Sequence, residues 1–131
     1  MPFEYKMLAI MTLIFLFSWV PISLAKYRAY GPKWLASNRE PLVGRELAPW
    51  GRRAERAHLN LKENFPAYFV AILLLGITER FDLVTTYASG LYVVSRLGHY
   101  AAYAKGNVNI RFLCYVFALS CNVILLLKVF Y

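Results

Sequence analysis

The sequence has few of the residues that build metal centres and disulfide scaffolds. It contains two histidines and two cysteines, and none of them shows a spacing typical of metal ligands. Cys114 and Cys121 are seven residues apart, which on a helix separates them by about 10 Å, too far for a disulfide. We therefore expect two core thiols and no metal site.

Charged residues are also scarce, and apolar residues make up 60% of the chain. A soluble domain typically has roughly 45–50%. Because a membrane-spanning helix needs about 20 mostly apolar residues, 131 residues allow up to four crossings and leave little room for a soluble domain. The composition predicts an all-α integral membrane protein.

Basic residues dominate the charge, and the formal net charge is +8. They concentrate between Lys26 and Arg56, in a polar stretch between two apolar ones. A basic loop beside a membrane segment is typical of the cytoplasmic side of a membrane protein. This clustering argues against nucleic acid as a partner.

The hydropathy pattern predicts one domain with four spans, at about residues 7–25, 54–78, 83–104 and 110–131, and a loop at 26–53. The first apolar stretch could instead be a signal peptide, because Ser23-Leu24-Ala25 resembles a cleavage site. Basic residues are numerous in the loop 26–53, whereas the second connection carries only Arg80 and the third carries Lys105. The positive-inside rule then places this loop in the cytoplasm and both termini outside, in a bacterial inner membrane or an ER-type membrane.

Three of the predicted spans each carry one polar stripe at helical spacing. The stripes are Arg56, Asn60 and Glu63; Tyr92, Arg96, His99 and Tyr103; and Arg111, Tyr115 and Asn122. Glu63, Arg96 and Tyr115 all lie roughly 21 to 24 Å from the non-cytoplasmic ends of their spans. Since opposite charges buried at one depth are less costly together, we expect an ion pair between Glu63 and Arg96.

A buried ion pair of this kind could simply fix the register of the helices. Arg56 and Arg111, however, remain without an acidic partner on these spans. Unpaired cations near a cytoplasmic surface favour a small anionic ligand from the cytosol. The pattern therefore predicts a binding site on this side of the membrane.

The residues of these stripes also resemble a known family. The runs RAERAHLNLKENFP (53–66), LYVVSRLGHYAAY (91–103) and IRFLCY (110–115) are similar to those of the MAPEG superfamily, the membrane-associated proteins of eicosanoid and glutathione metabolism. The resemblance covers the last three spans and implies a four-helix bundle assembled as a homotrimer. It also implies glutathione as cosubstrate, bound between neighbouring subunits near the cytoplasmic face.

The resemblance implies a role for each polar residue. Arg56, Asn60, Glu63 and Arg96 would hold the γ-glutamyl end of glutathione, and His99 and Tyr103 would line the cleft. The catalytic residues would be Arg111, which favours the thiolate, and Tyr115, which offers a hydroxyl or a stacking face. The implied reaction is attack of the thiolate on a lipophilic electrophile, or reduction of a hydroperoxide, with the lipophilic substrate arriving through the bilayer.

Two positions depart from the family pattern. Leu59 and Phe112 stand where some members have an arginine and a serine, which argues against an eicosanoid synthase. Lys26 or Arg28 could supply the missing cation, and His58 should face a neighbouring helix or lipid headgroups. The alternatives to a glutathione transferase or peroxidase are a non-catalytic lipid-binding relative, a structural membrane protein and a transporter that uses a buried Glu63.

Overall fold

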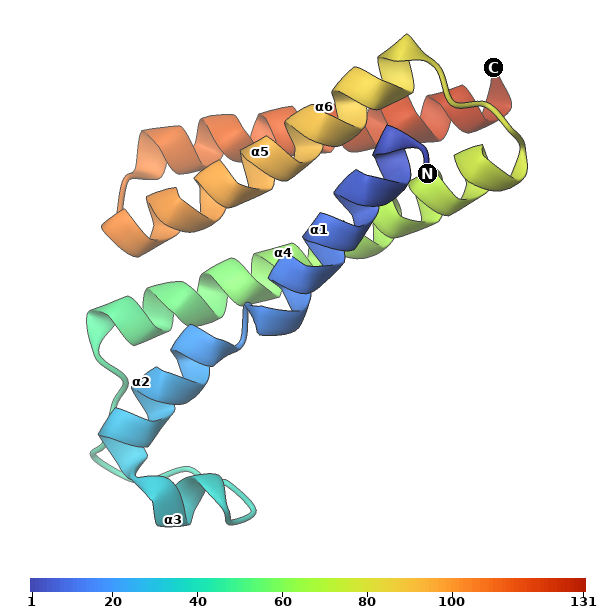
Figure 1. Ribbon diagram of the computed structural model, residues 1–131. Helices are drawn as coiled ribbons and strands as arrows, with labels where there is room; N and C mark the ends of the chain where they lie inside the picture. The colour runs from blue at the N-terminus through green and yellow to red at the C-terminus, as the bar shows by residue number, and fades with distance from the viewer.

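The computed structural model describes residues 1–131 and contains helices and no strands (Figure 1). It contains α1 (Phe3–Phe17), α2 (Val20–Tyr30), α3 (Pro32–Leu35), α4 (Pro49–Ile77), α5 (Leu83–Lys105) and α6 (Val108–Phe130). The expected all-α class is confirmed. Phe3–Tyr30 and Val108–Phe130 are the two helical stretches whose length and composition suffice to cross a membrane.

The first predicted span is longer than expected and is interrupted. α1 ends at Phe17 and α2 begins at Val20, and Pro21 lies in the first turn of α2. Proline fits a first turn because its missing N–H needs no helical partner there. Gly31 ends α2 with a φ of 85°, so the expected loop at 26–53 starts later and contains the short helix α3.

The last two helices begin and end with local signals. The Asp82 side chain accepts a hydrogen bond from the Thr85 backbone N–H, and the Thr85 hydroxyl accepts one from the Asp82 N–H, which caps the start of α5. Gly106, at a φ of 74°, ends α5, and the Asn107 side chain caps α6. This tight connection makes α5 and α6 an antiparallel pair that lie side by side (Figure 1).

One apolar core joins α1, α4, α5 and α6. Tyr68 of α4 and Tyr92 of α5 are fully buried and stack with their ring centroids 4.0 Å apart. Met11, Ile72 and Leu125 complete the centre of this core. Only 28 of 131 residues are buried, and large apolar side chains remain exposed along α1 and α6. Such an extended apolar surface is suited to lipid.

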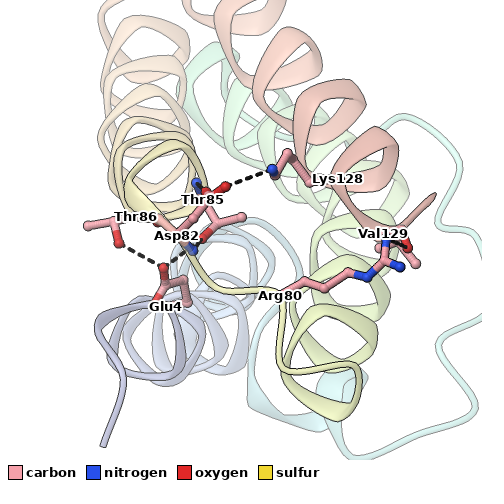
Figure 2. Close-up of polar contacts among 7 residues, drawn as sticks. All are labelled: Glu4, Arg80, Asp82, Thr85, Thr86, Lys128 and Val129. Carbon is pink, nitrogen blue, oxygen red and sulfur yellow. Dashed lines mark hydrogen bonds and ion pairs between the residues drawn. The ribbon is translucent and has the colours of Figure 1, made fainter. Parts of the chain in front are cut away.

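Polar contacts tie both termini to the connection between α4 and α5 (Figure 2). The buried Glu4 carboxylate accepts hydrogen bonds from the hydroxyls of Thr85 and Thr86, each at 2.8 Å. Lys128 pairs with Asp82 at 2.6 Å, and Arg80 donates to the Val129 carbonyl at 3.0 Å. The two chain ends and residues 78–82 therefore lie at the same end of the helices, called here the terminal end.

A small residue lets α2 approach the start of α4. A Cβ added at Gly51 would lie 2.6 Å from the Cβ of Ala25, closer than real side chains come. We expect Gly51→Ala to lower the free energy of unfolding by about 1–3 kcal/mol through overpacking, measured by thermal unfolding in detergent. Gly90→Ala, whose Cβ would meet only Phe3 at 3.4 Å, is the control and should change little. An unaltered melting temperature for Gly51→Ala, or no recovery in the Ala25→Gly/Gly51→Ala double variant, would contradict the packing.

The Lys128–Asp82 pair predicts a loss of stability in acid. The hydrogen bond from Lys128 holds the pKa of the Asp82 carboxyl below its usual value. The stabilisation is present above the usual aspartate pKa of about 4 and is lost as the pH falls through the lower folded value. Asp82→Asn, which keeps a cap, should therefore flatten the acid limb of the melting temperature measured against pH. An acid limb identical to that of the unaltered protein would refute this role of the pair.

Candidate functional site

Two adjoining cavities open between α4, α5 and α6 at the end opposite the terminal end. The first, called here the basic cavity, has a volume of about 460 Å³, and its wall includes Arg52, Arg53, Arg56, Tyr103, Val108 and Arg111. The second, called the aromatic cavity, has a volume of about 310 Å³, and its wall includes Asn60, His99, Tyr103, Arg111, Phe112 and Tyr115. The two share Tyr103, Val108 and Arg111 and form one continuous candidate site.

Four arginines and no carboxylate line the basic cavity. Arg52 pairs with Glu46 at 3.0 Å, outside the cavity wall, whereas Arg53, Arg56 and Arg111 form no ion pair. Uncompensated guanidinium groups beside low-dielectric protein attract anions. The wall of this cavity therefore carries a surplus of positive charge.

Arg96 lies directly behind the aromatic cavity and is only 2% exposed. Its terminal nitrogen donates to the Asn60 side-chain oxygen at 2.8 Å, and its Nε and other terminal nitrogen have no hydrogen-bond partner. The expected ion pair between Glu63 and Arg96 is wrong, because Glu63 is exposed and forms no salt bridge. Asn60 holds the position that the carboxylate was expected to take.

Aromatic rings connect the helices around the site. His99 is 2% exposed and meets Tyr103 edge to face at 5.1 Å, and its ring lies 6.3 Å from that of Tyr115. The Arg111 guanidinium lies over the Tyr103 ring, 4.6 Å from its centroid. A cation held against an aromatic face keeps a fixed position without losing its charge. Arg111 is thus placed where the two cavities meet.

The sequence of the chain matches one family model, that of the MAPEG family, over residues 5–131. This match covers nearly every residue, including all four arginines of the basic cavity. The chain belongs to the MAPEG family. No curated protein and no solved structure matches the chain.

Membership in the MAPEG family makes this a membrane protein with a function related to glutathione or eicosanoid metabolism. Glutathione has two carboxylates, one ammonium group and one thiol, and the arginines of the basic cavity fit its anionic groups. The Nδ1 atom of His99 is buried and has no hydrogen-bond partner within the chain. A carboxylate for the ammonium group is missing from both cavity walls.

The structure brings together most of the predicted site residues. Six of the predicted residues line the two cavities: Arg56, Asn60, His99, Tyr103, Arg111 and Tyr115. Arg96 supports Asn60 from behind, and Glu63 lies outside the site. Lys26 and Arg28 supply no cation to it, because neither residue lines the two cavities; Lys26 lies beside Glu55 at 3.0 Å, and Arg28 lies over the Trp50 ring.

His58 faces a neighbouring helix, as expected. Its Nδ1 shares a hydrogen bond of 2.7 Å with the Ser18 hydroxyl, and its ring stacks on Phe15. Two site residues, Arg52 and Arg53, escaped the sequence reasoning. They precede Arg56 by four and three residues, so helical spacing alone could have placed them on its face.

The Arg96–Asn60 hydrogen bond predicts a stability difference between two neighbouring asparagines. Asn60→Ala removes the one side-chain acceptor of a buried cation and should lower the free energy of unfolding by about 1–3 kcal/mol or more, seen in thermal unfolding. Asn64→Ala is the matched control, because the Asn64 amide donates only to a carbonyl of its own helix. Equal melting temperatures for the two variants would show that Arg96 does not depend on Asn60.

Proposed function

We propose that this MAPEG protein is a glutathione-dependent membrane transferase or peroxidase that acts on lipophilic electrophiles or hydroperoxides. The observation that carries the proposal is the basic cavity, where four arginines face a hollow without a carboxylate, beside apolar helices. Both cavities fall in the range of roughly 300–1,000 Å³ that small-molecule sites occupy.

Arg111 is the residue best placed to act on the thiol. It belongs to both cavities, and the Tyr103 ring fixes its guanidinium. A fixed cation favours the thiolate over the thiol, and the thiolate is the nucleophile. Tyr115, in the aromatic cavity, would direct its hydroxyl or ring to the second substrate. Attack of sulfur on an electrophilic carbon then forms the thioether while the leaving group departs with its electron pair.

The remaining arginines would hold the carboxylates of glutathione. Arg56, Arg52 and Arg53 come from the start of α4 and stand across the basic cavity from Arg111. Guanidinium groups bind carboxylates through paired hydrogen bonds, which fixes orientation as well as affinity. Asn60 and His99 would contact the peptide portion in the aromatic cavity, with Arg96 keeping Asn60 in place.

We further propose that the chain crosses the membrane four times and works as a homotrimer. α4 and α5 carry their polar stripes toward the site, so their composition is less apolar than that of the other two spans. Glu63 is exposed on α4, one turn from Asn60. In a trimer this carboxylate would lie at a subunit boundary, where it can accept the glutathione ammonium group. The loop 26–53 and the basic cavity would face the cytoplasm.

One observation favours a second candidate, a non-catalytic MAPEG protein that binds lipid. The single chain offers no carboxylate to the ammonium group of glutathione, and Phe112 puts an apolar ring beside Arg111. A transporter that depends on a Glu63 buried within one chain has no support, because Glu63 is exposed in the single chain.

Calorimetric titration in detergent tests the proposal with two ligands, glutathione and S-methylglutathione. Arg56→Gln should weaken both by about tenfold or more, since it removes a charge-assisted contact to a carboxylate. Arg111→Gln should weaken glutathione far more than S-methylglutathione, because only glutathione presents a thiolate. The charge control is Lys62→Gln, which removes an exposed cation of α4 outside both cavities.

Failure of glutathione to bind the unaltered protein would overturn the enzymatic proposal. Copurification of a lipid that Arg56→Gln and Arg111→Gln both release would then favour the second candidate. Equal weakening of the two ligands by Arg111→Gln would mean that this residue holds a carboxylate and does not act on sulfur.

A further inference from the structure

A third cavity is bounded by α2, the α3 region and α4. α2 and α3 lie on the side of α4 away from α5 and α6 (Figure 1). Its volume is about 380 Å³, and its wall includes Trp19, Lys26, Leu35, Arg39, Glu55 and Leu59. No residue of this α2–α4 cavity belongs to the basic or the aromatic cavity. The glutathione proposal therefore leaves it without a role.

The polar part of the α2–α4 cavity has a surplus of positive charge. Lys26 and Arg39 contribute two cations, and Glu55 contributes the one carboxylate, which pairs with Lys26 at 3.0 Å. Arg39 forms no ion pair, and its Nε donates to the Leu35 carbonyl at 3.3 Å. The terminal nitrogens of Arg39 are thus available to an anion, and the Lys26 ammonium can add a second contact.

The other part of the cavity is apolar and is partly open to the surface. Trp19 is 50% exposed and Leu59 is 49% exposed, and both residues line the cavity. A water-soluble anion would gain little from these side chains, and a neutral lipid would gain little from two cations. The combination suits an amphiphile with an anionic head and an apolar tail.

We propose that the α2–α4 cavity binds the phosphate group of an acidic membrane phospholipid. Arg39 and Lys26 hold the phosphate oxygens, and an acyl chain runs along Trp19 and Leu59. Tryptophan rings concentrate at the headgroup level of membranes, and basic pockets between helices bind lipid headgroups. This site is separate from the proposed glutathione function, and it gives the chain a lipid ligand of defined charge.

Fluorescence quenching by brominated lipids tests the site through Trp19. The chain has three tryptophans, so the Trp34→Phe/Trp50→Phe variant leaves Trp19 as the one reporter. In mixed bilayers, brominated phosphatidylglycerol should quench Trp19 at a mole fraction about fivefold lower than brominated phosphatidylcholine does. Equal quenching by the two lipids would overturn the proposal, because it would show contact with bulk lipid only.

A pair of charge-matched variants separates the cavity from general attraction to an acidic surface. Lys26→Gln/Arg39→Gln removes two cations of the cavity and should abolish the preference for phosphatidylglycerol. Lys33→Gln/Arg45→Gln removes two exposed cations that lie between α2 and α4 but outside the cavity, and this variant should keep the preference for phosphatidylglycerol. Loss of the preference in both variants would mean a diffuse electrostatic effect and would contradict a built site. Circular dichroism confirms that each variant keeps its helices.

Native mass spectrometry of the chain with all three tryptophans gives an independent readout. Phosphatidylglycerol adducts should survive on the unaltered protein and on Lys33→Gln/Arg45→Gln, and should be lost from Lys26→Gln/Arg39→Gln. Glycerol 3-phosphate in excess should fail to displace the lipid, because it lacks the acyl chains. Displacement by glycerol 3-phosphate would show a site for a free phosphate ester in place of a lipid. None of these measurements contains glutathione, so their failure is distinguishable from failure of the proposed enzymatic function.

Discussion

The burial of the Arg96 guanidinium among apolar helices is the constraint on which the site depends. A buried cation is expensive unless its hydrogen bonds are met, and Asn60 of α4 meets one of them at 2.8 Å. This bond fixes α4 against α5 at the level where His99 and Tyr103 project. The aromatic cavity therefore has a rigid back wall, and Asn60 stands in it with a fixed orientation.

The distribution of the acidic residues leaves the basic cavity without a carboxylate. Glu4 and Asp82 are held at the terminal end by threonines and by Lys128 (Figure 2). Glu55 pairs with Lys26 on the opposite side of α4, and Glu46 pairs with Arg52 outside the wall of the basic cavity. None lines the basic or the aromatic cavity. Arg53, Arg56 and Arg111 therefore have no carboxylate beside them where α4, α5 and α6 meet, and an anionic ligand would balance their charge.

Helical spacing predicted six of the residues that line the two cavities, because 3.6 residues per turn places Arg56 with Asn60 and His99 with Tyr103. It failed for Glu63, which is rotated by about 60° from Asn60 around α4, toward the exposed side. A polar stripe predicts which residues are neighbours along one helix. Whether a residue at the side of that stripe faces the site or the exterior depends on how the helices pack. The break at Ser18 could be read from the sequence, because Pro21 lacks the N–H that would bond to the Phe17 carbonyl and so disrupts the helix at this point. Assembly into a trimer depends on contacts between subunits, which the spacing of residues within one chain does not predict.

The proposed function depends on arginines of the basic cavity holding glutathione between α4, α5 and α6. A cryo-electron microscopy map of the protein in lipid nanodiscs with glutathione would locate the ligand. We expect ligand density in contact with Arg56 and Arg111, with Arg96 bonded to Asn60 behind it. Arg96 paired to Glu63 with the space between Arg56 and Arg111 closed, or glutathione bound elsewhere, would refute this binding site.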